Sequence, residues 1–366
     1  MRGSRACGER AADRTVTRQR HAVVVSPNAT DAPGGVERMS GIVVGVLREL
    51  GWRTTVVSPR GEPPRWRYRA GLGPLWLSRD AARAACRAAP AQLIVTNGFL
   101  GVGFPRHTPR VHVYHGTLVC DSLSIRRRLR RRELARRVLG GGLAEALSGR
   151  RATVVCVSRS AAAEVRRLYR VKVDAVIANA VDTAVFRPMP RQQARALLAL
   201  PEDHRLALFV GRPDQRKGVH LLPGAVRRAG YELVVAGSGE LPGATRHLGV
   251  LSPPELALAY CAADCVLLPS SYEACSFVVL EALACGAPLI ATRVGWVKDL
   301  VRVHPAYDAL CVRQEEAEIV QRLDNLDSLA TPALIDQVRL WVAAQHNLDC
   351  YVAIWRHLLT DLVGVA

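Results

Sequence analysis

Residues 267–292 read LLPSSYEACSFVVLEALACGAPLIAT, and this stretch decides the fold. It continues an apolar strand that begins at Cys265, and an apolar helix is expected over about 277–284. Gly286 can end that helix because glycine adopts the left-handed conformation without a steric penalty, and a second buried strand begins at Leu289. A strand, a loop, a helix and a strand in this order are typical of an open α/β sheet, in which ligands bind at the carboxyl ends of the strands.

Two glutamates stand in this unit. Glu273 lies in the loop, and Glu281 lies eight residues further on, inside the helix. A carboxylate among Phe, Val, Leu and Ala is costly to bury without a partner. Free N–H groups near Ser276, at the start of the helix, could hold a phosphate, while Glu281 could accept hydrogen bonds from hydroxyls one turn away. A solvated Glu281 on an exposed edge explains the pattern equally well.

The composition is that of a basic globular protein long enough for two domains. The chain has 366 residues, and its hydrophobic content of 49% is sufficient for full cores. The formal net charge of +18 comes almost entirely from arginine, because only three residues are lysines. Such a charge favours acidic ligands, nucleic acid or an anionic membrane. The wealth of arginine and alanine also points to a bacterial genome rich in G and C.

The sequence predicts neither a membrane span nor a secretion signal. It contains no apolar run of about eighteen residues, the length that a spanning helix needs. Residues 1–20 are basic and lack an apolar core, so we expect a disordered leader rather than a signal peptide. The ten cysteines are scattered without a C-x-x-C pair, which favours free thiols in a reducing cytosol over a zinc site. We expect a cytoplasmic protein, with peripheral contact at the inner face of the membrane left open.

Other polar and glycine residues also follow predicted strands. Gly34 and Gly35 come after a buried strand over 21–26 and open a helix, where glycines let the backbone approach a ligand. A plain turn explains the pair as well. His115 follows a strand over 111–114, where it could bind a ligand or be merely structural.

Arg212 and Lys217 lie between a buried strand over 206–210 and the next helix. Two cations in that position could meet a diphosphate. Exposed cations in a loop are also common, so the pair by itself leaves both interpretations open.

These residues together resemble the signature of the retaining glycosyltransferases of family 4. The likeness rests on Glu273-x7-Glu281, followed by Ala-Leu-Ala-Cys-Gly-Ala-Pro, and it covers about residues 21–362. Where the family has glycine after the first glutamate, this chain has Ala274. The resemblance implies the GT-B fold, in which two Rossmann-like, doubly wound α/β domains face a central cleft.

The resemblance also implies a nucleotide-sugar donor, with a UDP-sugar expected, and a role for each residue. Glu273 would orient the sugar and stabilise its developing charge, a covalent nucleophile being the less favoured role, and Glu281 would hold the ribose. Arg212 and Lys217 would stabilise the leaving diphosphate, and His115 would contact the donor sugar. The expected donor site comprises Gly34, Gly35, Gly211, Arg212, Lys217, Gly237, Leu251, Glu273, Cys275, Ser276, Phe277 and Glu281. No Asp-x-Asp stands in a suitable loop, so neither a metal nor a cofactor is expected.

The segment over 124–137 carries eight arginines. Apolar residues recur in and beside it at helical spacing, at Ile125, Leu129, Leu134 and Val138. An amphipathic helix is therefore expected, whose basic face could be solvated or could bind an anionic membrane or acceptor. No aromatic residue occurs over 116–168, so charge attraction is favoured over deep insertion into lipid. The acceptor, whose identity stays open, is expected near His115 and Arg126–Arg132.

The expected organisation is an acceptor-side domain over 21–187, a nucleotide-sugar domain over 188–345, and a helix over 346–366 that crosses back. Residues 60–77, rich in Pro, Gly, Arg and Trp, are expected to form a loop. The expected function is retaining glycosyl transfer to a natural product, a lipid-linked sugar or a glycan, without nucleic acid as a partner. An epimerase-like enzyme of the same fold and a non-catalytic nucleic-acid-binding protein are the alternatives.

Overall fold

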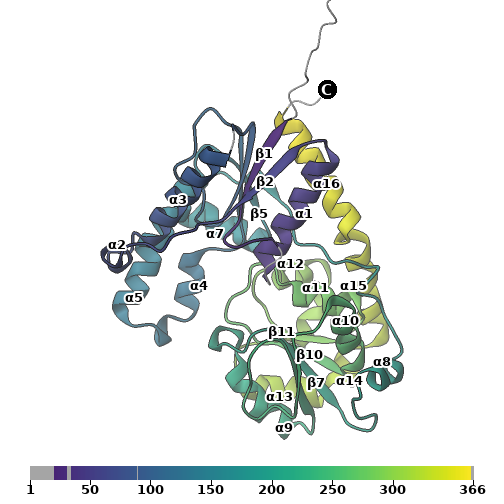
Figure 1. The fold of residues 1–366 in the computed structure, drawn as a ribbon. Coiled ribbons are helices and arrows are strands. Elements are labelled where there is room, and N and C mark those ends of the chain that lie inside the picture. The colour runs from purple at the N-terminus through teal and green to yellow at the C-terminus, as the bar shows by residue number, and fades with distance from the viewer. Residues whose placement is uncertain (1–19, 31–33, 89, 364–366) are drawn as a thin grey trace, which may run out of the picture.

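The computed structural model describes residues 20–30, 34–88 and 90–363, which form two α/β lobes (Figure 1). The leader predicted over 1–20 lies, up to residue 19, outside the described residues. Each lobe is built on a six-stranded parallel sheet, which confirms the predicted α/β class with two Rossmann-like units. No helix in the described part of the chain has both the length and the apolar character needed to cross a membrane.

The first lobe has the strand order β2-β1-β3-β4-β5-β6. Its strands are β1 (His21–Val25), β2 (Arg53–Val57), β3 (Leu93–Asn97), β4 (Arg110–Tyr114), β5 (Thr153–Cys156) and β6 (Ala175–Val176). The central strands read as continuous apolar runs such as HAVVV, because a parallel sheet covered on both faces exposes none of their side chains. Its helices are α1 (Gly35–Glu49), α2 (Arg65–Arg69), α3 (Gly73–Ala88), α4 (Leu118–Ser124), α5 (Arg131–Ala135), α6 (Gly142–Ser148) and α7 (Arg159–Tyr169).

The second lobe has the strand order β12-β11-β10-β7-β8-β9. Its strands are β7 (Leu206–Val210), β8 (Glu232–Ala236), β9 (Arg246–Gly249), β10 (Cys265–Leu268), β11 (Leu289–Thr292) and β12 (Cys311–Val312). The helices that follow the first lobe are α8 (Arg191–Leu197), α9 (Leu222–Arg228), α10 (Pro253–Ala262), α11 (Phe277–Ala284), α12 (Val297–Val303), α13 (Glu316–Asp324), α14 (Leu326–Leu329), α15 (Pro332–Gln345) and α16 (Leu348–Val363). The strand–loop–helix–strand unit predicted from residues 265–292 is thus β10, α11 and β11.

Each sheet has one point at which the strand order reverses. In the first lobe β1 lies between β2 and β3, and in the second lobe β7 lies between β8 and β10. At such a point the loops after the two neighbouring strands diverge and leave a crevice at their carboxyl ends. The loops that follow β1, β7 and β10 all contribute to one cavity between the lobes.

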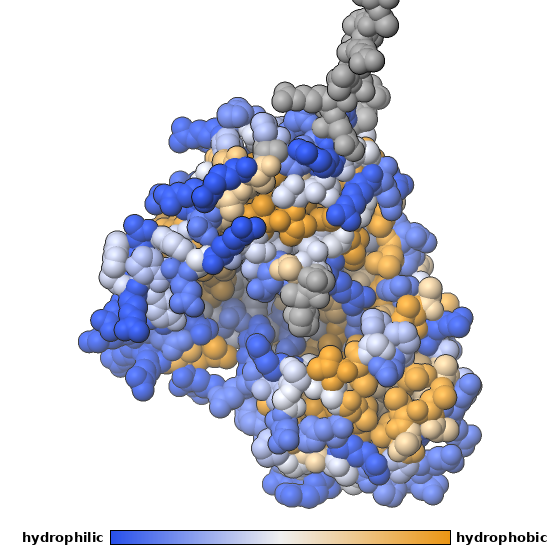
Figure 2. All heavy atoms as spheres, in the orientation of Figure 1, coloured by the Kyte–Doolittle hydropathy of each residue, from blue (hydrophilic) through white to orange (hydrophobic). Residues whose placement is uncertain are grey.

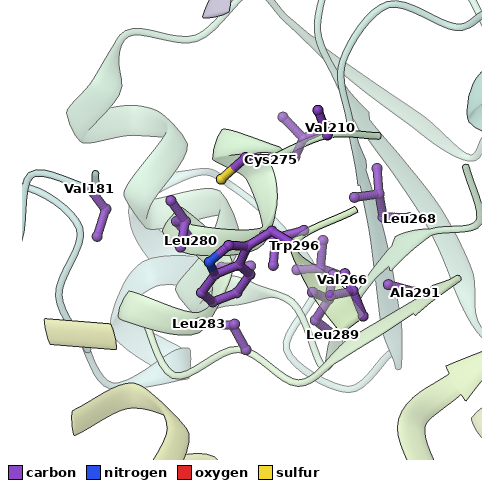
Figure 3. Packing of buried hydrophobic residues seen from close by; sticks show 14 of the residues in the cluster. Val181, Val210, Val266, Leu268, Cys275, Leu280, Leu283, Leu289, Ala291 and Trp296 are labelled. Atoms are coloured by element: carbon purple, nitrogen blue, oxygen red, sulfur yellow. The ribbon is translucent and has the colours of Figure 1, made fainter. Parts of the chain in front are cut away.

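Helix α11 is held by apolar contacts on one side and faces the first lobe on another. Leu280 and Leu283 belong to a buried cluster with Val266 and Leu289 of the sheet (Figure 3). Val181, in the segment that leads out of the first lobe, belongs to the same cluster. The helix therefore has a fixed position at the junction of the two lobes.

The last helix, α16, packs on the first lobe although the chain reaches it from the second. It lies along α1 in Figure 1. Tyr351, Trp355 and Leu359 are buried on one face of it, and Arg356 pairs with Glu49 of α1 on the outside. One apolar face of α16 thus ties the chain's end to its first helix.

Two local predictions were wrong. The loop predicted over 60–77 contains α2 and the start of α3, which begins at Gly73. The helix predicted over 124–137 is interrupted, because α4 ends at Ser124, a 3-10 turn spans Arg126–Arg128, and Leu129 and Arg130 are extended.

Like charges explain the interruption. A continuous helix would place four arginine pairs four residues apart, beginning at positions 126, 127, 128 and 132, and each such pair is destabilising. The break at Leu129 and Arg130 separates the first three of these pairs. After the break, Glu133 and Arg137 make a favourable pair at this spacing, with 2.9 Å between the charged atoms. The helix continues as a π-helix over Arg136–Gly141.

The docking of α16 gives a test of stability. Trp355→Ala should lower the free energy of unfolding by about 3–5 kcal/mol, because it leaves a cavity where a fully buried indole stood. Arg356→Ala, at the next position, breaks only an exposed ion pair and should cost less than about 1 kcal/mol. Urea denaturation of both variants measures the difference. Equal losses would contradict the assignment of α16 as a packed element of the first lobe.

Candidate active site

A cavity of about 360 Å³ lies between the lobes, at the carboxyl ends of both sheets. Gly35 and His115 line it from the first lobe, and Lys217, Glu273 and Ser276 line it from the second. Figure 2 shows the molecule hollowed between the lobes in the same region. Five residues that the sequence analysis singled out separately, from segments far apart in the chain, are therefore brought together.

Glu273 and Lys217 form an ion pair inside the cavity. The Lys217 Nζ atom lies 2.7 Å from Glu273 Oε1, which also accepts a hydrogen bond from Ser270 at 3.0 Å. Both side chains are largely shielded, with 16% of Lys217 and 14% of Glu273 exposed. The loop around Glu273 is packed tightly against Gly295, where a Cβ atom would come within 2.1 Å of the Glu273 carbonyl oxygen. Only glycine fits there, so the backbone fixes the position of the carboxylate.

The N-terminus of α11 faces this ion pair. Ser276 precedes the helix, and its side chain makes no capping hydrogen bond. The first N–H groups of a helix have no partner within it, and its dipole favours a negative charge there. The lysine and the helix end thus present positive charge from the two sides of one cavity.

Glu281, one turn deeper in α11, is buried and fully engaged. Arg38 of α1 donates to its Oε1 atom at 2.5 Å, and the Tyr260 hydroxyl donates to its Oε2 atom at 3.0 Å. The alternative of a solvated Glu281 on an exposed edge is wrong, since only 3% of the residue is exposed. Burial, with Glu281 nearby, raises the pKa of Tyr260 well above its usual value, so Tyr260 stays a hydrogen-bond donor.

His115 borders the cavity as a neutral side chain. Asn97 donates its two amide hydrogens to Val25 and Ser40, so its Oδ1 atom accepts from His115 Nε2 at 2.8 Å. The Nδ1 atom of His115 then carries a lone pair. Burial lowers the pKa of His115 to about 4, and the imidazole can contact a ligand without bringing a charge.

Two family patterns match the chain, one on each lobe. The pattern described as "Glycosyltransferase Family 4" matches residues 33–185, and the pattern described as "Glycosyl transferases group 1" matches residues 204–327. Together the two matches span more than half of the chain.

The chain belongs to the family-4 glycosyltransferases. Curated D-inositol 3-phosphate glycosyltransferases from Mycobacterium bovis and Mycobacterium tuberculosis are 36% identical to it over 146 residues. That match covers 35% of this chain and only 30% of each relative's length.

Solved structures confirm the GT-B fold. Sucrose-phosphate synthase from Thermosynechococcus elongatus superimposes with a TM-score of 0.76 at 23% identity, over 95% of this chain and 100% of that one. Anabaena HepE, solved in complex with UDP and glucose, superimposes with a TM-score of 0.66 at 15% identity, over 93% of this chain and 100% of that one. At these identities the likeness is one of fold.

Some predicted donor residues of this family-4 glycosyltransferase lie apart from the cavity. Cys275 and Phe277 line it, as Gly35 does. Arg212 is exposed and is not among the lining residues, although it follows β7 as expected. The remaining members of the predicted donor set do not line the cavity either: Gly34, Gly211, Gly237, Leu251 and the buried Glu281. None of the arginines over 126–132 lines it either, and Arg128 instead reaches the backbone oxygen of Gln215 across the lobes at 2.7 Å.

Three residues that the sequence analysis did not single out belong to the site. Arg216 lines the cavity and pairs with Asp121 of the first lobe, with 3.1 Å between the charged atoms. The Tyr272 hydroxyl accepts from the Thr117 backbone N–H at 2.7 Å. Asn179 lines the cavity, and its buried Oδ1 atom has no hydrogen-bond partner among the described residues. The position of Arg216 beside Lys217 was the only sequence signal for any of them.

A second cavity of about 260 Å³ adjoins the first on the side of the first lobe. The two share His115, Arg216 and Tyr272. Burial raises the pKa of Glu145, at its wall, to about 8, so this carboxyl is mostly protonated at neutral pH. Asp121, also at the wall, is paired with Arg216, and the second cavity therefore has little net charge. Across the described residues, no group of three His, Cys, Asp or Glu side chains suits a metal ion.

The neutral state of His115 predicts a loss of stability in acid. A histidine whose pKa is lowered from 6.5 to about 4 on folding stabilises the protein above pH 6.5, and this contribution is lost as the pH falls towards 4. When the pH is lowered from 7.5 to 4.5, the free energy of unfolding should fall by on the order of 1–3 kcal/mol more in wild type than in His115→Gln. The glutamine keeps a hydrogen-bond donor for Asn97. Chemical denaturation at both pH values measures this, with exposed His357→Gln as the control. Equal losses in wild type and His115→Gln would exclude a buried neutral imidazole.

Proposed function

We propose that this protein is a retaining glycosyltransferase that moves a sugar from a nucleoside diphosphate sugar, most simply a UDP-sugar, to an acceptor hydroxyl. The observation that carries the proposal is the meeting of Lys217, Glu273 and the free N-terminus of α11 in one cavity between two parallel sheets. The family of the chain supports sugar transfer. The UDP bound to the structurally similar Anabaena protein supports the choice of nucleotide.

The donor would replace the Lys217–Glu273 ion pair with two better-matched contacts. Its diphosphate suits Lys217 and the α11 N-terminus, and its sugar hydroxyls suit the Glu273 carboxylate. Negative charge grows on the leaving diphosphate as the glycosidic bond breaks, so a fixed cation there stabilises the transition state more than the bound donor. Arg212, on the exposed loop after β7, would join the diphosphate from solvent. Protein cations and dipoles thus supply the charge that a metal supplies in other transferases.

Retention of configuration requires the acceptor on the same face of the sugar as the leaving diphosphate. The second cavity adjoins the first beside His115, which would contact the sugar as a neutral hydrogen-bonding group. A leaving phosphate oxygen would take the acceptor proton, and Glu273 would stabilise the positive charge that develops on the sugar. The low net charge of the second cavity supports an uncharged, hydroxyl-bearing part of the acceptor at that point.

The test is sugar transfer from a panel of nucleotide sugars to candidate hydroxyl acceptors. We expect an α-linked donor to give an α-linked product by proton NMR, and activity to persist in EDTA. Glu273→Gln, which keeps the shape and removes the charge, should lower kcat on the order of 10²-fold with little change in donor affinity. A β-linked product would refute retention, and a sugar epimerised without an acceptor would favour the epimerase-like alternative.

We also propose that the first lobe contacts an anionic membrane through a basic patch on α2 and the arginine-rich segment. Trp66 and Tyr68 of α2 are 61% and 54% exposed, and Leu139 of the π-helix is 72% exposed. Arg136 lies 4.2 Å from the Tyr68 ring centre, so α2 is packed beside the arginine-rich segment. The exposed arginines of the patch are Arg65, Arg69, Arg126, Arg127, Arg128, Arg130, Arg131, Arg132 and Arg137.

The patch combines the two features that a lipid surface recognises. Figure 2 shows blue side chains gathered where α2 and α5 lie, at the left edge of the first lobe. Aromatic side chains favour the membrane interface, and arginines are attracted to anionic lipid. The sequence pattern had favoured charge attraction alone, because no aromatic residue occurs near the arginines in the chain. The fold brings Trp66 and Tyr68 to them from α2 instead.

Vesicle co-sedimentation tests this surface. Wild type should bind phosphatidylglycerol vesicles and not phosphatidylcholine vesicles, because each arginine near an anionic surface contributes about 1 kcal/mol. The triple variant Arg130→Glu, Arg131→Glu and Arg132→Glu should weaken binding to these vesicles at least 100-fold. Adding Trp66→Ala should weaken it further. Arg227→Glu with Arg228→Glu, on α9 of the second lobe, is the matched charge control. Equal binding by all variants would exclude the patch, and stronger binding to a DNA duplex than to lipid would favour the nucleic-acid alternative.

A further inference from the structure

Glu281 is closed off from the donor cavity by a residue of the opposite lobe. Gly35, Val36 and Phe277 line the cavity, whereas Glu281 is not among the described residues at its wall. Arg38, one turn into α1, donates to Glu281 Oε1 at 2.5 Å. The other carboxylate oxygen accepts from Tyr260, so each oxygen of Glu281 is engaged before any ligand binds.

Arg38 is placed so that it can leave. Its side chain is 35% exposed, while that of Glu281 is 4% exposed. Its guanidinium also lies 4.5 Å from the ring centre of Phe277, whose side chain borders the cavity. Arg38 therefore contacts both the buried carboxylate, through an ion pair, and a side chain at the cavity wall, through a cation–π contact.

We propose that Arg38 is a gate on the nucleoside part of the donor site, an inference that rests on the proposed function. Arg38 pairs with Glu281 in the structure, and on donor binding a ribose hydroxyl would take its place at Oε1. Glu281 cannot simply lose this partner, because a buried carboxylate needs hydrogen-bond donors. A vicinal diol supplies O–H donors in the position that Arg38 vacates.

The freed guanidinium has a destination on the same side of the cleft. Arg38 follows the Gly34–Gly35 opening of α1, and Gly35 lines the cavity opposite Lys217. A diphosphate held there would attract the displaced cation. A nucleoside alone must break the Arg38–Glu281 pair without this compensation, whereas a nucleoside diphosphate regains a contact with Arg38. The gate thus makes the site select nucleotides that carry a diphosphate.

The test compares uridine with UDP by calorimetry on wild type and Arg38→Ala. Uridine should bind Arg38→Ala roughly fivefold to thirtyfold more tightly, the range for one partly exposed charge-assisted contact that no longer has to be broken. The affinity for UDP should rise less in Arg38→Ala than the affinity for uridine. The ratio of UDP affinity to uridine affinity should therefore be about tenfold lower in Arg38→Ala than in wild type. Arg38→Gln, which keeps a neutral donor for Glu281, should shift both values in the same direction by less. Arg356→Ala, which breaks the exposed pair with Glu49, should change neither.

The double variant Arg38→Ala with Glu281→Gln separates a gate from a loosened cleft. The gain in uridine affinity should vanish in it, because the ribose no longer meets a carboxylate. A gain in uridine affinity that persists in the double variant would overturn the gate. A uridine affinity that is unchanged or weaker in both Arg38→Ala and Arg38→Gln would also overturn it. In either case, UDP binding by wild type would leave the proposed function standing. Uridine binding by Arg38→Ala alone would support the gate. No nucleotide binding by any variant would overturn both the gate and the proposed function.

Discussion

A buried negative charge on an otherwise apolar helix is the constraint on which the relation of the two lobes depends. Helix α11 packs through Leu280 and Leu283 into the core of the second lobe, and Glu281 stands between them. An uncompensated carboxylate there would cost several kcal/mol. The second lobe supplies one donor, Tyr260, and the first lobe supplies Arg38. The electrostatic balance of one lobe is thus completed by the other.

Other polar side chains around the cleft also find their partners in the opposite lobe. Arg216 pairs with Asp121 across the lobes, and Tyr272 donates from the second lobe to Glu164 of the first at 2.8 Å. Lys217 and Glu273 satisfy each other within the second lobe. Charges that are already fixed in a shielded cleft need little rearrangement when a ligand exchanges with one partner, which is the condition for strong electrostatic stabilisation of a transition state. The charged groups around the cleft are therefore satisfied by one another.

The sequence predicted what depends on local pattern and missed what depends on distant contacts. Strand β10 and helix α11 were predicted with their observed bounds, because apolar runs and a terminating glycine are local signals. The partner of Glu281 could not be predicted, because Arg38 lies 243 residues away in the chain. The arginine-rich segment has the spacing of an amphipathic helix, yet repulsion between arginines four residues apart outweighs that pattern. Asn179 was not singled out from the sequence, because its unpartnered oxygen is evident only in the fold.

A departure from the family signature in the loop of Glu273, Ala274 in place of glycine, is accommodated by the opposite lobe. Ala274 is buried, and its carbonyl accepts from the Trp296 N–H at 2.9 Å. Its methyl group faces Gly116, where a Cβ atom would lie 3.2 Å from the Ala274 Cβ and 2.7 Å from the Tyr272 hydroxyl. Gly116 has a φ of 113°, a conformation that side chains rarely adopt, so this position stays without a side chain. The absence of a side chain at Gly116 leaves room for the Ala274 methyl group against the first lobe. The backbone around Glu273 can therefore keep the geometry that places its carboxylate beside Lys217. Because the Ala274 methyl group needs the space at Gly116, the conformation of the loop around Glu273 depends on the first lobe.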